Sequence, residues 1–327
     1  MSMISADATT ETSPPTTSVR YTAGDVAIAI PTYGRDQVLV DTIQSCLDQA
    51  EPAGELIIVD QTPQHSPEVE ATLAEWHRQG TIRWERLKHP STPAAMNRAL
   101  ELSSKPLVLF LDDDVLLAPG SVAAHAAAHD REDRWIVVGQ IIQPWQQPTD
   151  ITHPPSPPGA LRADLEFPFH SQTPCALQNV MAGHMSVRRD RAVEVGGFDE
   201  NFHGAAYRFE TEFGRRVIRA GGEIRFEPRA SLRHLRAERG GTRTHGNHLV
   251  SPSPHHGVGD YYFALLHGWR TDVAWYCARR MMREVCTRFH LRHPWYIPVK
   301  LVGEIRAFAW ACALVRRGPA LLGTERR

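Results

Sequence analysis

The sequence has 327 residues, and its 36 lysines and arginines nearly balance 37 aspartates and glutamates, giving a formal net charge of −1. This balance excludes a protein that binds nucleic acid through a uniformly basic surface. Hydrophobic residues make up 42% of the chain, which excludes wholesale disorder. A chain of this length can bury a large core without disulfides or metal staples. Length alone allows one large α/β domain or two domains.

The two ends of the chain differ from the middle. Residues 1–20 are rich in Ser, Thr and Pro and lack an apolar run, so we predict a disordered leader over residues 1–23 and no signal peptide. Residues 261–327 hold twelve basic and four acidic side chains, an excess of +8. The longest apolar run there, Ala307 to Val315, is far shorter than the ~20 residues that a membrane-spanning helix needs.

From Asp25 to Ile142, short apolar runs alternate with stretches of helical periodicity. Strands separated by helices predict an α/β fold, with a Rossmann-like, mostly parallel sheet flanked by helices. The predicted strands cover residues 26–30, 55–60, 81–87, 106–111 and 135–142, and the predicted helices cover 36–49, 67–79, 93–103 and 120–130.

After Gln143 the pattern changes. Pro144 to Gly159 carries six prolines and predicts a long irregular connection. We therefore predict one domain over residues 24–240, with halves 24–142 and 143–240. It is followed by a flexible loop over 241–260 and a basic helical region of two or three helices over 261–327.

Polar side chains stand where three of the predicted strands end. They are Thr32, Asp60 and the triple Asp112-Asp113-Asp114. Ligands of open α/β sheets bind at the carboxyl ends of the strands, but the first strand is followed by neither GxGxxG nor a P-loop. Carboxylates fit such a site if one accepts hydrogen bonds from a ribose or base and another holds a divalent cation. The competing interpretation of the triple is a solvated turn that caps the next helix.

These residues, in this order, resemble family 2 glycosyltransferases, which have the GT-A fold. The resemblance covers roughly residues 25–236. It is carried by Pro31-Thr-Tyr, Ile58-Val-Asp60, Asn97, Leu111-Asp-Asp-Asp114, Met181 to Arg188, Val195 to Glu200, Phe209 to Arg216, Ala220-Gly-Gly222 and His234.

The resemblance implies a role for each matching residue. The half 24–142 would bind the nucleotide, and the half 143–240 the acceptor. Thr32 and Asp60 match contacts to the base and ribose, Asp112 and Asp113 would touch ribose or the metal shell, and Asp114 would bind the metal. His234 would add a ligand to the metal or diphosphate. The remaining candidates are Tyr33, Arg35 and Asn97 for the nucleotide sugar, and Gly183, His184 and Arg208 for the acceptor and sugar pocket. Arg208 could equally form a surface salt bridge.

The general base is where the sequence departs from the family. The family has Glu-Asp before a helix, and here Phe209-Glu210 stands in that place. Glu210 keeps a carboxylate and is the favoured base, while another register would use Glu212. Residues two apart point to different faces of a helix, so only one of the two can face the donor. Met96 also replaces the arginine of the family's ARN motif.

The resemblance implies an inverting glycosyltransferase that acts by metal-assisted single displacement. It would move a hexosyl or deoxyhexosyl group from a UDP-, dTDP- or GDP-linked donor to a polysaccharide, a lipid-linked glycan or a glycoside. The cofactor would be Mn²⁺ or Mg²⁺, since hard cations suit oxygen ligands and manganese tolerates an imidazole better. Five cysteines that form no CxxC pair favour a reducing compartment, so we predict a cytoplasmic protein, with the inner face of the membrane as an option. We predict no nucleic-acid partner.

Several alternatives stay open. A nucleotidyltransferase would want a Gly-rich basic loop after the first strand, and a non-catalytic sugar-nucleotide binder would explain Phe209 and Met96. Trp145 could stack on a sugar or pack within its loop. The basic helical region could lie on an anionic membrane or pack on the domain. The histidines 245, 248, 255 and 256 could form a metal site or belong to a lid over the active site.

Overall fold

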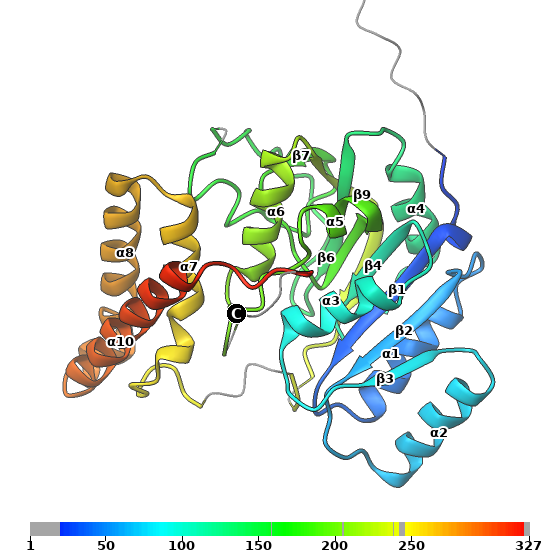
Figure 1. Ribbon diagram of the computed structural model, residues 1–327, viewed down its shortest axis with the longest axis horizontal. Coiled ribbons are helices and arrows are strands. Elements are labelled where there is room, and N and C mark those ends of the chain that lie inside the picture. Colours follow the sequence, from blue (N-terminus) through cyan, green and yellow to red (C-terminus); the bar gives the residue numbers. More distant parts are fainter. Residues whose placement is uncertain (1–19, 158, 205, 238, 242–245, 324–327) are drawn as a thin grey trace, which may run out of the picture.

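The computed structural model describes residues 20–323 except 158, 205, 238 and 242–245. Within this described part, nine strands form one sheet with the order β3-β2-β1-β4-β8-β6-β9-β5, and β7 pairs with β9 (Figure 1). The strands are β1 (Val26–Thr32), β2 (Glu55–Asp60), β3 (Arg83–Arg86), β4 (Leu107–Leu111), β5 (Val115–Leu117), β6 (Arg134–Ile142), β7 (Cys175–Leu177), β8 (His184–Arg188) and β9 (Glu223–His234).

The first half of the sheet is parallel, as the sequence predicted. Strands β3, β2, β1 and β4 lie side by side in the same direction, and the register places Thr32 beside Asp60. Their connecting helices are α1 (Gln37–Leu47), α2 (Pro67–Arg78) and α3 (Thr92–Leu102). Helices α2 and α3 each carry a proline in the first turn, where its missing N–H costs nothing.

Side chains on both faces of the sheet are buried, which explains the near-continuous apolar strands. On β1, Val26, Ile28 and Ile30 pack against α1, α2 and α4 (Ser121–Ala128), whereas Ala27 and Ala29 face α3 and the helices of the second half. The two apolar clusters confirm the predicted α/β architecture with helices on both faces.

The second half contains antiparallel pairings that the sequence did not predict. Strand β8 runs antiparallel to both β4 and β6, and β9 runs antiparallel to β5 and parallel to β6. Two helices belong to this half, α5 (Arg189–Glu194) and α6 (Phe209–Arg219).

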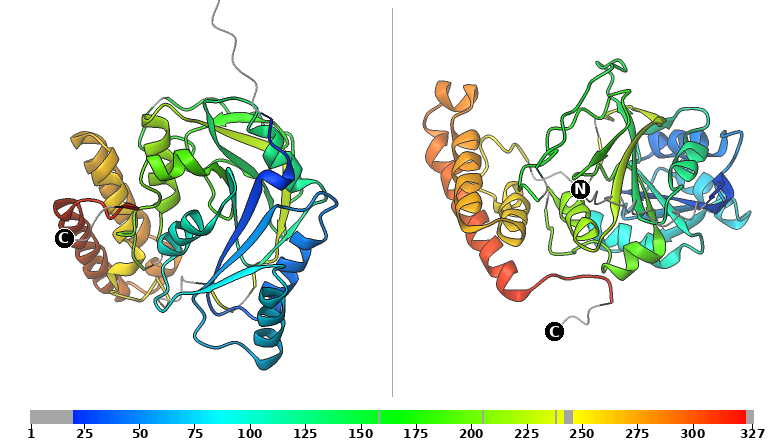
Figure 2. Two further views of the ribbon diagram at one scale, coloured as in Figure 1. Left: turned by 45° about the vertical axis from the view of Figure 1, so that its right-hand side comes forward. Right: turned by 90° about the horizontal axis from the view of Figure 1, so that it is seen from above.

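The chain ends in the C-terminal helical layer, residues 258–317. It comprises α7 (Val258–His267), α8 (Arg270–Val285), α9 (Arg288–Arg292) and α10 (Tyr296–Arg317). Figure 2 shows these helices, coloured from yellow to red, on the side of the molecule away from β1–β3, and α7 packs against α6. The short helix η2 (Pro254–His256) and the start of α7 fall inside the stretch predicted as a loop. None of the helices among the described residues is long and apolar enough to cross a bilayer.

A buried ion cluster holds this layer together. The Arg280 guanidinium contacts Asp260 and lies 3.2 Å from Glu304, and the Lys300 ammonium lies 3.1 Å from Glu304 and 3.4 Å from Glu284. Arg280, Lys300, Asp260 and Glu304 are all nearly inaccessible. Each buried charge therefore has an opposite charge beside it, the condition under which charge burial is tolerated.

Candidate active site

The ends of β1, β4 and β9 open into a cleft of about 1200 Å³. Nine of the residues singled out from the sequence line it, namely Thr32, Tyr33, Arg35, Asp112, Asp113, Asp114, Gly183, Glu210 and His234. Segments far apart in the chain thus meet at the carboxyl edge of the parallel strands, where α/β sheets bind ligands.

Two of the three aspartates are held by residues of β1 and its following turn. Asp113 accepts a hydrogen bond from the Thr32 hydroxyl at 2.8 Å and one from Arg35 Nε at 3.0 Å. Arg35 also donates to Asp114 Oδ2 at 3.0 Å. The same guanidinium donates to the backbone carbonyl of Ala237 at 3.2 Å and to that of Arg239. Arg35 is thus a buried positioning residue that joins the aspartates to the segment after β9.

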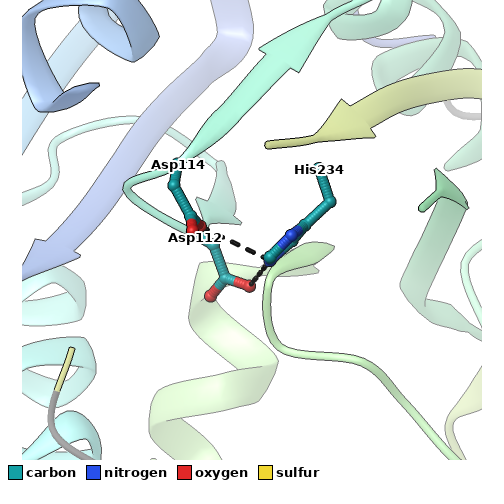
Figure 3. Close-up of side chains that lie close together, drawn as sticks. All are labelled: Asp112, Asp114 and His234. Carbon is teal, nitrogen blue, oxygen red and sulfur yellow. Dashed lines mark ion pairs between the residues drawn. The ribbon is translucent and has the colours of Figure 1, made fainter. Parts of the chain in front are cut away.

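The site also contains an imidazole, that of His234, which comes from β9 in the second half of the sheet. In the β5–β9 register His234 lies directly opposite Val115, the residue after Asp114. Its Nε2 lies 3.4 Å from Asp114 Oδ1 and 3.6 Å from Asp112 Oδ2, and Figure 3 shows the three side chains pointing toward one another. Its Nδ1 accepts the Arg236 N–H at 3.1 Å, which leaves Nε2 for the carboxylates.

This trio could hold a metal ion. Potential ligand atoms of Asp112, Asp114 and His234 all lie within 4.8 Å of one another. Asp114 Oδ2 is engaged by Arg35 and the Ala237 N–H, whereas Oδ1 faces His234. Two oxygens and an imidazole nitrogen suit Mn²⁺ or Mg²⁺, with the nitrogen favouring manganese.

Electrostatics show that the cleft carries excess negative charge. Burial raises the pKa of Asp113 to about 6, even though Arg35 and Thr32 favour its ionised form. Burial lowers the pKa of His234, but Asp112 and Asp114 outweigh that effect, so its pKa is raised overall. Of the three aspartates, only Asp113 and Asp114 pair with Arg35, and a bound cation would relieve the excess of negative charge.

Gly183 has a steric reason to lack a side chain. A Cβ built on it would come within 2.2 Å of the Asp112 carboxylate. The Gly183 carbonyl also accepts the Asp112 N–H at 3.2 Å, so the two backbones touch where β4 ends and β8 begins. Gly183 thereby makes room for Asp112 in the cleft.

The structure separates the two candidate bases on α6. Glu210 is half-buried and lines the cleft. Glu212 is buried on another face of α6. Its two carboxylate oxygens each accept a hydrogen bond from Arg216 at 2.7 Å, and His267 Nε2 lies 3.5 Å away. Burial alone would raise the pKa of Glu212, but His267 and Arg216 hold that pKa below its usual range.

Asp60 and Asn97 lie outside the lining of the cleft. Asp60 accepts the Thr62 N–H at 2.8 Å and the Trp84 indole N–H at 3.0 Å, and its Oδ2 lies 2.8 Å from His65 Nε2. Asn97 exchanges two hydrogen bonds with the Phe198 backbone, at 2.8 and 2.7 Å. Both polar side chains are thus already satisfied within the protein.

His184 and Arg208 also point away from the cleft. His184 is fully buried, with Nδ1 3.1 Å from the Gln140 carbonyl, and burial lowers its pKa to about 3. Arg208, at the start of α6 with a φ of 72°, lies 3.1 Å from Asp260 in α7. This salt bridge is with a buried carboxylate and not at the surface, and it anchors the helix that carries Glu210.

Arg236 and Gln61 are among the cleft residues that had no part in the sequence predictions. Arg236 lies two residues after His234 and places its guanidinium 4.7 Å from the ring centre of Trp145. Gln61 directly follows Asp60 and lines the cleft. Their positions beside candidate residues at strand ends are a signal that could have marked both.

Of the predicted histidine cluster, His245 lies outside the described residues. His256 is buried against the C-terminal helical layer, where its backbone carbonyl accepts a hydrogen bond from Arg280.

Sequence comparison identifies the family. The profile described as "Glycosyl transferase family 2" matches residues 27–197, more than half of the chain. The chain belongs to this family. No protein of curated function matches the sequence significantly.

Solved structures agree on the fold of this family 2 protein. A structure of GalNAc-T7 with UDP, GalNAc and Mn²⁺ matches 86% of this chain with a TM-score of 0.57 and 14% identity. The mannosyltransferase PcManGT from Pyrobaculum calidifontis, in complex with GDP-Man and Mn²⁺, matches 93% with a TM-score of 0.50 and 15% identity. TarS from S. aureus matches 81% with a TM-score of 0.52 and 13% identity.

These likenesses confirm the predicted GT-A fold. The chain spans 54% of the length of GalNAc-T7, 44% of TarS and 81% of PcManGT. The matches cover 81–93% of this chain, and at such low identity the likeness concerns architecture alone.

Proposed function

We propose that this protein transfers a sugar from a nucleoside-diphosphate sugar to a hydroxyl acceptor, with inversion, using a divalent cation. The observation that carries the proposal is that one cleft is lined both by the group Asp112, Asp114 and His234 and by a separate carboxylate, Glu210. The first group suits a cation with a diphosphate, and the second suits a general base.

Different residues of the cleft would carry out different parts of the proposed sugar transfer. Glu210 accepts the proton of the acceptor hydroxyl as its oxygen bonds to the anomeric carbon and the bond from that carbon to the diphosphate oxygen breaks. Thr32, Tyr33 and Arg35 lie where the nucleotide would enter, next to Asp113. A bound Mn²⁺ or Mg²⁺ would neutralise charge on the departing diphosphate. Gly183 leaves room for Asp112, and Arg236 offers a further positive charge beside the site.

The nucleotide is proposed to be UDP, GDP or dTDP, since the similar structures carry UDP or GDP-Man with Mn²⁺. The sugar is proposed to be a hexose or deoxyhexose. A polysaccharide, a lipid-linked glycan or a glycoside would serve as acceptor. Asp60 and Asn97 are proposed to act indirectly, because their polar atoms already bind the Trp84 ring and the Phe198 backbone.

A donor panel tests the proposal. The protein would be mixed with UDP-, GDP- and dTDP-sugars, with and without Mn²⁺, while thermal stabilisation and nucleoside diphosphate release are recorded. We expect one donor class to stabilise the protein only with metal, and Asp114→Ala to weaken that effect more than about 100-fold. Asp41→Ala is the matched control, because Asp41 lies exposed on α1 and bonds Gln37.

Three results would contradict the proposal. The first is stabilisation that is equally strong without metal or in Asp114→Ala. The second is release of pyrophosphate from nucleoside triphosphates, which would indicate a nucleotidyltransferase. The third is donor binding with no turnover on any acceptor, which would indicate a sugar-nucleotide binder.

A further inference from the structure

The C-terminal helical layer exposes three tryptophans that no helix of the described chain covers. Trp269, Trp275 and Trp295 are 83%, 65% and 62% exposed. Large aromatic rings rarely stand this far into water on a soluble surface, but they are typical of the headgroup region of a bilayer. Leu291, between α9's arginines, is 71% exposed as well.

Four exposed apolar residues between Val302 and Ala313 lie on one face of α10. Val302 and Ile305 are 49% and 55% exposed, and Ala309 and Ala313 continue the same face at helical spacing. Arg306 and Arg316 border this stripe. An exposed apolar stripe edged by arginines is the pattern of a helix that lies in a membrane interface.

The exposed charges of the layer have nearly one sign. The buried cations Arg280 and Lys300 are neutralised inside by Asp260 and Glu304, so they contribute little to the surface. Among side chains described as exposed from Trp269 to Arg317, the acidic group is Asp272. The basic ones are Arg279, Arg283, Arg288, Arg292, Arg306, Arg316 and Arg317.

The excess of exposed arginines indicates which kind of partner this face would bind. A second copy packed on the same face through a two-fold axis would bring these arginines against their own counterparts, which is unfavourable. A bilayer with anionic headgroups offers the complementary charge and an apolar layer for the tryptophans. We propose that the exposed face of α8, α9 and α10 docks this protein onto an anionic membrane surface as a peripheral protein.

Vesicle flotation tests the docking without any donor or acceptor, so its outcome is separate from that of the proposed function. The whole protein would be floated with vesicles of phosphatidylcholine and phosphatidylglycerol, and with vesicles of phosphatidylcholine alone. We expect binding to the anionic vesicles that weakens as salt rises, because added salt screens surface charge.

Two double variants locate the contact. Arg279→Gln with Arg292→Gln should weaken partitioning about thirtyfold, from the usual contribution of an arginine near an anionic surface. Trp269→Ala with Trp275→Ala should weaken it as well. The matched control, Arg78→Gln with Arg131→Gln, removes two exposed arginines from other parts of the molecule and should bind as the parent does.

Thermal melting of each variant establishes that it is folded. The proposal is overturned if neutral and anionic vesicles bind equally or not at all. It is also overturned if the control weakens binding as much as the two test variants do. A dimer in light scattering that disappears in the tryptophan variant, without vesicle binding by the parent, would instead assign the face to a second copy.

Discussion

Two of the clusters in which the protein buries charge differ in their balance. In the C-terminal helical layer, Asp260 and Glu304 face Arg280 and Lys300, and each charge has an opposite partner. In the cleft, Arg35 pairs with Asp113 and Asp114 but not with Asp112, and His234 is the only further group of opposite charge among the ion pairs of the three aspartates in the described chain.

The difference in charge balance indicates different roles for the two clusters, one structural and one functional. A balanced cluster away from the cleft fixes the position of helices and needs nothing from outside. An unbalanced one in the wall of a cleft is stable only because some of its groups reach solvent, as Asp112 does with a side chain 53% exposed. Such a cluster is ready to accept a cation.

The two clusters are connected through α6. Asp260 of the balanced cluster lies 3.1 Å from Arg208, which stands at the N-terminus of α6, two residues before Glu210. Helix α7 also contacts α6 further along, where His267 approaches Glu212. The C-terminal helical layer therefore helps to position Glu210, which lines the same cleft as Asp112, Asp114 and His234.

The largest effect is expected at Glu210. Glu210→Gln keeps the shape of the side chain but removes the base, so turnover should fall by about 10²–10⁴-fold with donor binding unchanged. Steady-state kinetics and a donor titration measure the two quantities. Glu212→Gln is the comparison, and it should lower stability through the loss of the Arg216 contact while turnover persists. If turnover instead persists in Glu210→Gln and is lost in Glu212→Gln, the other register is correct.

The second effect concerns stability. Asp260→Asn leaves Arg280 and Arg208 without their shared carboxylate, and breaking a buried pair costs about 3–5 kcal/mol. Asp114→Asn should cost less, because it reduces an excess of negative charge and Arg35 keeps Asp113. Urea denaturation of both variants without added metal gives the free energies of unfolding.

Glu75→Gln provides the control for this comparison, since its exposed pair with Arg78 should leave stability unchanged. An equal loss in Asp114→Asn and Asp260→Asn would remove the distinction between an unbalanced and a balanced cluster.

A third effect follows from buried histidines behind the cleft. Ser186 Oγ lies 2.9 Å from His125 Nδ1 and 2.9 Å from His129 Nε2. Burial lowers the pKa of His129 to about 4, with a smaller effect of Arg188 and Arg134 in the same direction. Since the unfolded chain takes up this proton near pH 6.5, stability is full above that pH and is lost as the pH falls toward 4.

The loss from His129 should reach about 3 kcal/mol at pH 4. Urea denaturation from about pH 7 to pH 4 measures it. His129→Gln should remove about 3 kcal/mol of this dependence, and the rest should persist because burial also lowers the pKa of His184, to about 3. His89→Gln, at an exposed position, should retain the whole dependence. A slope that His129→Gln leaves unchanged would place the acid sensitivity elsewhere.

The sequence predicted the first half of the sheet well because parallel βα units are local patterns. Asp112, Asp113 and Asp114 follow the most apolar strand, and the structure brings them to the cleft as expected. The antiparallel partners β8 and β9 depend on pairings between distant segments, and no local pattern encodes those. The same limit applies to orientation, because a strand alternates its side chains between two faces.

Gly183 and His184 show the limit most clearly. Both were assigned to one pocket from the sequence, yet Gly183 lies in the cleft and the His184 ring lies in the core, within 2.3 Å of where a Cβ on Gly139 would stand. Asp60 ends β2 as expected and Asn97 lies in α3, but their hydrogen-bond partners come from Trp84 and Phe198. A sequence without coordinates cannot specify those partners.

The smallest effect on stability is expected for a substitution of Gly183. In Gly183→Ala the new methyl group would stand 2.2 Å from the Asp112 carboxylate, which must move. Asp112 is exposed enough to swing away, so stability should hardly change, whereas metal affinity should fall about 10–100-fold. Mn²⁺ titration followed by isothermal calorimetry measures this loss. A parental affinity in Gly183→Ala would mean that Asp112 is not a ligand, and that Asp114 and His234 hold the cation without it.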